Sequence, residues 1–279
     1  MGTPLLSIII PALNEEKYLP VLLTDIKKQK TKNFEVIVVD GESEDDTVKK
    51  AKTFLNSFPL SIYSCSKRDV SVQKNLGASH AKGQYIVFLD ADSRLPVGFT
   101  TNAAKEIAKH KHLVYLPHIY PLTKSPTDKL MFNIINFFVD LSQNMGKPLP
   151  SVGSMIFERH FFTFLGGYWS GHAEDHDIIL RTKRYGVTGK YVKNVRVGYS
   201  LRRYEHEGTI NVAMKNFIST IQMTFRGRIV RQLFEYEMGG QHYKSTELKK
   251  NMVRDVHRQN QRNILLRFSR RLSQLLLED

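Results

Sequence analysis

Tyr85-Ile86-Val87-Phe88-Leu89-Asp90-Ala91-Asp92 carries the clearest structural signal in this chain. Its apolar part is rich in β-branched and aromatic residues and predicts a buried strand. The strand ends in two carboxylates separated by one small residue. In an open α/β sheet, ligands bind in the crevice outside the carboxyl ends of the strands. Two carboxylates at that edge suit Mg²⁺ or Mn²⁺ shared with a diphosphate, although an isolated Asp-x-Asp also fits a solvated acidic turn.

Three further strands are expected before this one, at residues 7–11, 34–40 and 60–64. Each is followed by a segment whose apolar side chains recur at helical spacing. Asn14-Glu15-Glu16 predicts the start of the first helix, because an Asn there can cap the free backbone N–H groups. Strands alternating with helices predict an α/β fold with a doubly wound, mostly parallel sheet flanked by helices.

The composition is that of a globular protein large enough to bury a full core, with 279 residues, 41% of them hydrophobic and 24% charged. The single cysteine, Cys65, excludes an intramolecular disulfide and a Cys-based zinc cluster, which favours a reducing, cytoplasmic setting. No basic leader with a cleavage site opens the chain, so no signal peptide is expected. No apolar run approaches the roughly 20 residues needed to span a bilayer.

The net charge of +14 calls for an anionic partner: nucleic acid, a membrane surface or an anionic small substrate. Residues 202–279 carry a large share of the excess, chiefly on arginine. Arginines interleaved with apolar residues at helical spacing favour a membrane or protein surface over nucleic acid, and no nucleic-acid motif is present.

Polar side chains follow three of the predicted strands, at Asn14-Glu15, Asp40 and Asp90-Ala91-Asp92. Each could be a cap or a turn alone, but parallel strands would bring all three to one sheet edge. The Gly-x-Gly-x-x-Gly turn and the Gly-x-x-x-x-Gly-Lys-Ser/Thr loop are both absent after the first strand. A nucleotide would therefore not lie in a glycine cradle, and a metal would have to neutralise much of its phosphate charge.

Four segments in this order resemble family-two glycosyltransferases of the GT-A fold, over about the first 200 residues: Ser7-Ile-Ile-Ile-Pro-Ala-Leu-Asn-Glu15, Val38-Val-Asp-Gly-Glu-Ser43 with Asp46-Thr47, Lys74-Asn75-x-Gly77-Ala78, and Phe88-Leu-Asp-Ala-Asp92. The resemblance implies a nucleotide-sugar donor, a divalent metal on the Asp-x-Asp motif and inversion at the anomeric carbon. It places these residues around the donor: Pro11, Asn14, Glu15, Asp40, Lys74, Asp90 and Ala91. Asp92 would be the direct metal ligand, with Asp90 shared between metal and ribose. Gly41-Glu42-Ser43 departs from the family's more usual Asp-Gly-Ser, which leaves open which nucleotide base the donor carries.

Residues 125–141 predict a helix with Leu130, Ile134, Phe137, Phe138 and Leu141 on one face. Core packing is the favoured role of this face, and contact with a membrane or a lipid acceptor is the alternative. Residues 151–157 resemble the family's small-residue strand before the acceptor site, where a sugar can approach the backbone.

The segment Gly166-Gly-Tyr-Trp-Ser-Gly-His-Ala-Glu-Asp-His-Asp177 holds the second cluster of chemistry. Acidic residues at a helix start have an ordinary explanation in capping and the helix dipole. The segment also resembles the family's Glu-Asp motif. An inverting transfer needs one general base, for which Asp175 is the candidate, with Glu174 orienting the acceptor or holding the loop. Asp177 is expected to cap or to form a salt bridge. Three residues are expected on the acceptor side: Trp169, His172 and His176.

Arg202 and Arg203 could close over the diphosphate, or form a basic surface turn. His206 is a further candidate for the metal shell, although most lone histidines are not ligands. We expect a GT-A domain over residues 1–208, with a nucleotide-sugar half at about 1–95 and an acceptor half at about 96–208.

Residues 209–279 predict a helical, basic extension. Its last helix would gather apolar residues on one side: Val253, Val256, Ile264, Phe268, Leu272 and Leu275. Such a stripe opposed by arginine fits a helix in a membrane interface, a helix docked on its own domain, or a contact with a second subunit in a homodimer. The sequence leaves these three open.

The leading hypothesis is therefore a cytoplasmic, metal-dependent inverting glycosyltransferase of the hexosyltransferase type, peripheral to the inner face of the cell membrane if its acceptor is lipid-linked. One alternative is a sugar-phosphate nucleotidyltransferase, against which Pro11-Ala-Leu-Asn-Glu15 counts because that class needs a Gly-rich basic loop there. The other is a non-catalytic basic protein that binds a membrane or polyanion, in which the acidic clusters would have no task.

Overall fold

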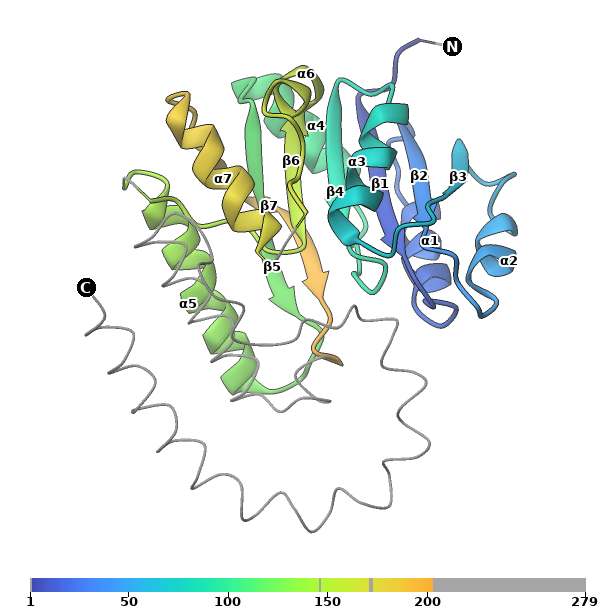
Figure 1. Cartoon of the computed structure of the whole chain (residues 1–279). Helices are drawn as coiled ribbons and strands as arrows, with labels where there is room; N and C mark the ends of the chain where they lie inside the picture. Colours follow the sequence, from blue (N-terminus) through green and yellow to red (C-terminus); the bar gives the residue numbers. More distant parts are fainter. Residues whose placement is uncertain (1, 146, 171–172, 203–279) are drawn as a thin grey trace, which may run out of the picture. The chain divides into compact units, whose positions relative to one another are not determined.

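The computed structural model describes residues 2–145, 147–170 and 173–202. These residues form one seven-stranded sheet in the order β3-β2-β1-β4-β6-β5-β7, with helices on both faces (Figure 1). The strands are β1 (Leu6–Ala12), β2 (Phe34–Asp40), β3 (Leu60–Ser64), β4 (Tyr85–Leu89), β5 (Val114–Pro121), β6 (Ser154–Glu158) and β7 (Lys190–Tyr199). The predicted boundary at residue 208 and the basic extension lie outside the described residues.

The sheet is parallel apart from β6. β1 pairs in parallel with β2 and β4, β2 with β3, and β5 with β7, whereas β6 runs antiparallel to both of its neighbours, β4 and β5. Six strands therefore end at one edge of the sheet, and β6 begins there. The predicted mostly parallel sheet is confirmed, while β7, which no sequence pattern indicated, adds a strand at the far side.

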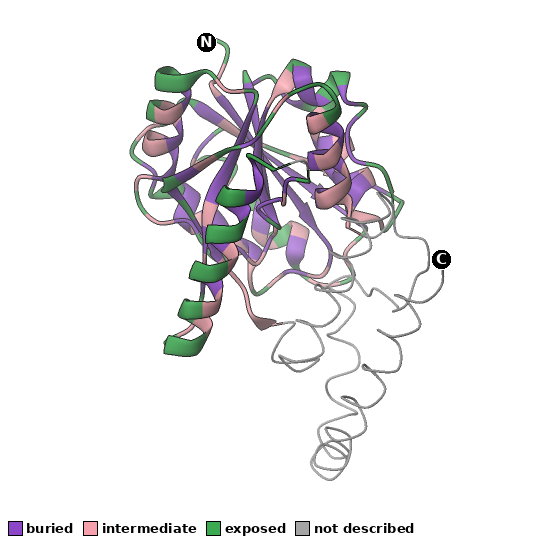
Figure 2. Cartoon of the chain, turned by 90° about the vertical axis from the view of Figure 1, so that its left-hand side faces the viewer, coloured by how far each residue is buried: buried purple, intermediate pink, exposed green. Residues whose placement is uncertain are grey.

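Two apolar layers cover the sheet. On one face lie α1 (Leu19–Lys27), α2 (Thr47–Lys52) and α4 (Phe99–His110). On the other lie α3 (Val70–His80), α5 (Pro126–Ser142), α6 (Arg159–Phe164) and α7 (Glu174–Arg184). Alternate residues of the central strands supply the two layers: Ile8 and Ile10 face one, and Ile9 faces the other. Each such side chain contributes about 1.5–3 kcal/mol when fully buried. The central strands are accordingly buried along their length (Figure 2).

The first helix begins later than the sequence predicts. α1 starts at Leu19, and Asn14 has a left-handed backbone with φ 54°. The Asn14 side chain instead accepts a hydrogen bond from the backbone N–H of Glu44 at 2.8 Å. Asn14 is therefore not a helix cap but a link between the loops that follow β1 and β2.

The prediction for the apolar face of α5 is wrong. The residues that α5 buries are Phe132, Asn136, Val139 and Ser142. The Asn136 side chain hydrogen-bonds both the N–H and the C=O of Ile119 in β5. The face expected in the core is exposed instead, with exposed fractions from 46% to 62% at Leu130, Ile134, Phe137, Phe138 and Leu141 (Figure 2). Among the described residues, no helix is long and apolar enough to cross a membrane.

Candidate active site

Asp90 and Asp92 lie directly beyond β4, at the edge where the parallel strands end. The Asp92 side chain is 19% exposed. Burial raises the pKa of the Asp90 carboxyl to about 7; the nearby Lys74 opposes the rise, and Asp92, Asp175 and Glu174 add to it. Both carboxylates of the motif are partly exposed, and the neighbouring acids and burial disfavour the charged form of Asp90.

Gly153 joins this motif to the second acidic cluster. Its backbone N–H donates to Asp175 Oδ2 at 2.9 Å. A Cβ on Gly153 would lie 2.5 Å from Asp90 Oδ2, and its φ of 70° disfavours any other residue. The small-residue strand predicted at residues 151–157 begins only at Ser154, as β6, and at Gly153, just before it, the group that approaches the backbone is Asp90.

Glu174 and Asp175 form the first turn of α7. Ala173 precedes them with a left-handed φ of 63°, and α7 has no side-chain N-cap. Lys74 Nζ lies 3.1 Å from Glu174 Oε1 and 3.3 Å from Asp175 Oδ1. Burial raises the pKa of the Glu174 carboxyl, and Lys74 partly offsets that rise. The acid pair is therefore an ion-paired cluster rather than a helix cap.

Asp177 has the ordinary role that the sequence predicts. It forms a salt bridge within α7, at 2.8 Å from Arg181. Arg181 is buried and also donates to the carbonyl oxygens of Leu165 and Gly167, the second at 2.6 Å. It thereby fixes the glycine turn that leads into the acidic cluster, and the sequence analysis missed it.

The loops after β1 and β2 form the other wall of the site. Asp40 accepts hydrogen bonds from the Ser43 backbone N–H at 3.0 Å and from its hydroxyl. The Ser43 hydroxyl also accepts from the backbone N–H of Asn14 at 2.8 Å. Pro11 and Glu15, like Asp40, are buried at this edge. The residues expected around base and ribose thus lie together at the ends of β1 and β2 and on the linked loops that follow them.

Arg202, three residues beyond β7, reaches across to both walls. Its guanidinium binds Glu15 through two nitrogens at 2.9 and 2.6 Å, lies 3.1 Å from Asp92 Oδ2 and stands over the Tyr18 ring. Burial raises the pKa of Glu15 to about 7, with Arg202 opposing. A bidentate, fork-shaped contact of this kind is also the geometry with which arginine recognises phosphate. Arg203 and His206 lie outside the described residues.

The expected acceptor side is partly described. Trp169 is 57% exposed and stacks on the Arg181 guanidinium at 4.4 Å. His176 lies in the first turn of α7, beside Asp175. Burial lowers the pKa of the His176 imidazole, and the charge of Asp175 opposes that shift. His172 lies outside the described residues. The glycine turn that begins at Gly166 is held to α3, because the Asn75 side chain exchanges two hydrogen bonds with the backbone of Tyr168, at 2.7 and 2.8 Å.

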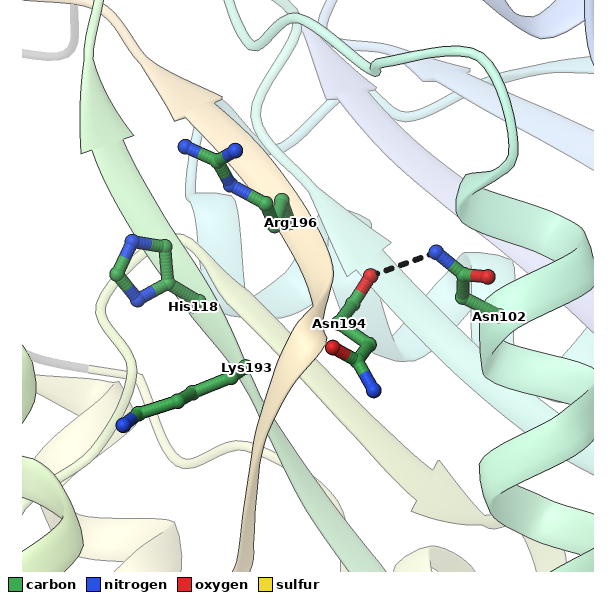
Figure 3. A pocket seen from close by; sticks show the side chains of 5 residues that line it. All are labelled: Asn102, His118, Lys193, Asn194 and Arg196. Carbon is green, nitrogen blue, oxygen red and sulfur yellow. Dashed lines mark hydrogen bonds between the residues drawn. The ribbon is translucent and has the colours of Figure 1, made fainter.

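A separate basic hollow of about 580 Å³ lies across the edge strand (Figure 3). It is lined by Asn102, His118, Lys193, Asn194 and Arg196, and the Asn102 amide donates to the Asn194 carbonyl at 2.8 Å. The pairing of β5 with β7 shifts register here, between Pro117 and His118. None of these residues is one that the sequence singles out, and no carboxylate lines the hollow, so it is distinct from the acidic site.

The donor set fits a divalent metal shared with a diphosphate. In the described part of the chain, no group of three or more His, Cys, Asp or Glu side chains could hold a metal alone. Mg²⁺ and similar ions are commonly held by one or two carboxylates together with substrate phosphates. Asp90 and Asp92 would supply two such hard oxygen ligands at this edge, and the Asp90 carboxylate, whose pKa is raised, would gain by pairing with a cation.

Comparison with known proteins agrees with this arrangement. Over 97 residues the chain is 37% identical to a PGL/p-HBAD biosynthesis glycosyltransferase of Mycobacterium bovis; the match covers 34% of this chain and only 38% of that relative. It is 32% identical over 115 residues to the poly(ribitol-phosphate) β-N-acetylglucosaminyltransferase TarS of Staphylococcus aureus, covering 39% of this chain and 20% of TarS. The chain thus spans well under half the length of these relatives.

Two of the solved structures that match show the shared fold. The mannosyltransferase PcManGT from Pyrobaculum calidifontis, in complex with GDP-Man and Mn²⁺, matches with a TM-score of 0.65 at 20% identity, over 83% of this chain and 67% of that one. TarS residues 1–349 with UDP-GlcNAc match with a TM-score of 0.59 at 20% identity, over 79% and 67%. At this identity the likeness establishes the GT-A fold alone.

Two family models match the sequence itself. Glycosyl transferase family group 2 matches residues 85–265, and glycosyl transferase family 2 matches residues 7–162. Each covers more than half of the chain, and together they include both acidic clusters of the site. The chain therefore belongs to glycosyl transferase family 2.

Proposed function

We propose that this protein is a metal-dependent inverting hexosyltransferase, which moves a sugar from a nucleoside-diphosphate sugar to an acceptor hydroxyl. One observation carries the proposal: the Asp90–Asp92 pair and the Glu174–Asp175 pair lie at one sheet edge, joined through Gly153 and Lys74. Inverting transfer needs a diphosphate site and a single base on opposite sides of the sugar. These two pairs supply them.

Asp92 and Asp90 would hold the metal, which stabilises the negative charge that develops on the diphosphate. Asp40 at the end of β2, with Asn14 and Glu15 on the loop after β1, would bind the base and ribose. Arg202 already lies beside Asp92 at 3.1 Å, so its guanidinium is placed to contact the diphosphate oxygens.

Asp175 would act as the general base. The acceptor oxygen attacks the anomeric carbon, its proton passes to an Asp175 oxygen, and the bond between sugar and diphosphate breaks with its electron pair leaving on the diphosphate. No acid needs to protonate this leaving group, because metal and cations stabilise it. Among the described residues, each Asp175 oxygen has one contact, Oδ1 with Lys74 and Oδ2 with the Gly153 N–H, which leaves lone-pair capacity for the proton.

The related proteins support a nucleotide-sugar donor without naming it. PcManGT was solved with GDP-Man and Mn²⁺, TarS with UDP-GlcNAc, and a third match, GalNAc-T7, with UDP, GalNAc and Mn²⁺. The nucleotidyltransferase alternative lacks support, since the loop after β1 carries no glycine-rich basic segment. In the other alternative, a non-catalytic basic protein that binds a membrane or polyanion, Glu174 and the buried Asp175 would have no task.

We propose further that the acceptor is lipid-linked and that the protein is cytoplasmic and peripheral to the inner face of the membrane. The exposed apolar face of α5 supports this, because an amphipathic helix can lie in a membrane interface. Replacing Phe137 and Phe138 by serine should reduce flotation with anionic liposomes, while Val97→Ser, an equally exposed control, should not. Unchanged flotation would refute membrane contact, and a dimer that the serine pair dissociates would assign the face to a second copy.

The decisive first experiment is a donor panel. The protein with Mn²⁺ and each nucleotide sugar should slowly release nucleoside diphosphate, with water as acceptor. Asp92→Asn should abolish this release and the metal-dependent binding of donor, whereas Asp46→Asn, an exposed carboxylate beside α2, should leave both unchanged. Metal-dependent donor binding that survives Asp92→Asn would show that the metal assignment is wrong.

A further inference from the structure

Lys74 is a buried lysine placed inside the acidic cluster. It lies on α3 and is 2% exposed, the only lysine among the described residues that is buried to this degree. A lysine is rarely buried unless it is paired, because removing its charge from water is costly. Burial by itself lowers the pKa of Lys74, but Asp175 and Glu174 hold it well above its ordinary value. The ammonium therefore stays charged.

Both ion pairs of Lys74 go to the acid pair, while the nearby Asp90 acts on it through charge alone. Its Nζ lies 3.1 Å from Glu174 Oε1, 3.3 Å from Asp175 Oδ1 and 4.7 Å from the centre of the Tyr168 ring. The resemblance to the family suggested a basic residue near the nucleotide here. Two of the three N–H donors of Nζ already go to these carboxylates, so at most one remains for a diphosphate oxygen.

The Asp175 carboxylate is contacted on both of its oxygens. Lys74 contacts one carboxylate oxygen, and the Gly153 N–H donates to the other at 2.9 Å. Rotation of the carboxylate would break both contacts, so they fix its plane. General bases depend on such fixed geometry, since the proton must be taken along one direction as the new bond forms.

We propose that Lys74 is a positioning residue: it holds the Asp175 carboxylate in the orientation that accepts the proton of the attacking hydroxyl, and it does not bind the donor. The neighbouring Asn75 supports this assignment, because it ties the backbone of Tyr168 to the same helix. Two adjacent residues of α3 thus fix the turn and the acid pair that follows it. This inference rests on the proposed function.

The test compares Lys74→Met, Lys74→Arg and the double variant Lys74→Met/Glu174→Gln with Lys49→Met, an exposed lysine. The double variant removes one carboxylate with the cation, so the cluster keeps its net charge. Two quantities are measured with Mn²⁺ and whichever of UDP-GlcNAc or GDP-mannose the wild type hydrolyses: the dissociation constant of the donor and the rate of nucleoside diphosphate release at saturation.

Lys74→Met should lower the release rate by about 100-fold or more, the range of general-base effects, and leave the donor dissociation constant within a few-fold. Lys74→Arg should recover part of the rate, because a guanidinium can still contact both carboxylates. If Lys74→Met does not fold, the double variant should fold and show the same result, a lowered release rate with a nearly unchanged donor dissociation constant. Lys49→Met should behave as wild type.

Weakened donor binding in step with the lost rate would overturn the inference, since Lys74 would then bind the donor. An unchanged rate in Lys74→Met or in the double variant would also overturn it. Failure of the proposed function is a different result: the wild type itself would then release no nucleoside diphosphate from any donor.

Discussion

Gly153→Ala is the substitution whose effect follows most directly from the geometry. A Cβ at this position would lie 2.5 Å from Asp90 Oδ2 and 3.3 Å from its Cγ. The Asp90 carboxylate would have to retreat by about 0.9 Å to reach an ordinary contact distance of roughly 3.4 Å. The backbone φ of 70° adds a strain of about 1–2 kcal/mol for a residue with a side chain.

A matched control separates the clash from the strain. Gly186, just after α7, has nearly the same φ of 72°, but nothing lies within 4 Å of a Cβ built there. Gly186→Ala should therefore cost only the strain, which lowers the melting temperature by roughly 2–8 °C in a domain of this size, with full activity. Gly153→Ala should lose at least as much stability and also displace Asp90.

The displacement of Asp90, rather than the backbone strain, should determine how much activity Gly153→Ala loses. A misplacement of about 1 Å can reduce a rate by about 100-fold, so Gly153→Ala should lose most of its Mn²⁺-dependent release of nucleoside diphosphate and bind Mn²⁺ and donor more weakly. Differential scanning calorimetry and the release assay measure the two effects side by side. Equal activity in the two alanine variants would refute the assignment of Asp90 to the donor and metal site.

Three further predictions concern other parts of the site. Tyr168→Phe should leave the melting temperature unchanged or higher, because the buried Tyr168 hydroxyl has no hydrogen-bond partner among the described residues; a drop of several degrees would contradict this. Asn75→Ala should lower the free energy of unfolding by about 1–3 kcal/mol in urea titrations, because two buried backbone groups of Tyr168 lose their partners; a change below that range would show that the turn is held elsewhere. Since the pKa of Glu15 is raised from 4.5 to about 7 in the folded state, its contribution to stability is full below pH 4.5 and is lost as the pH rises through 7. Glu15→Gln should therefore gain stability relative to wild type over that interval, by about 3 kcal/mol at most, and a pH-independent difference would contradict the assigned burial.

Much of the donor half could be predicted from the sequence because its signals are local. A buried strand such as β4 is a continuous apolar run, and the carboxylates that follow it in the chain lie at its end in space. Parallel pairing then places Asp40 and Asp90 at one edge without further information. The position of Asp177 in a salt bridge could likewise be expected from its four-residue spacing to Arg181.

The acceptor half depends on contacts between distant segments. Lys74 meets Glu174 across 100 residues of sequence, and Gly153 stands between two acids from two other elements. No local pattern encodes such meetings. For the same reason, the apolar spacing of α5 indicates which residues share a face but not which face packs on the core. The hydrogen bonds of Asn136 to Ile119 in β5 fix the face of α5 that is turned to the sheet.

β7 escaped prediction for a different physical reason. Val192, Val195 and Val197 point into the core, but the irregular pairing with β5 between Pro117 and His118 inserts residues that break the two-residue alternation of a strand. The charged side chains of Lys193 and Arg196 then make the segment resemble a surface loop. The end of β7 nevertheless places Arg202 beside Asp92 in the site.

The central claim is that Asp175 takes the proton of the attacking hydroxyl while Asp90 and Asp92 hold the donor end. The most direct measurement is the rate of nucleoside diphosphate release by Asp175→Asn at saturating donor and Mn²⁺, together with the donor dissociation constant. The rate should fall by about 100-fold or more and the dissociation constant should stay within a few-fold of wild type. Release at the wild-type rate, or loss of donor binding along with the rate, would contradict the account.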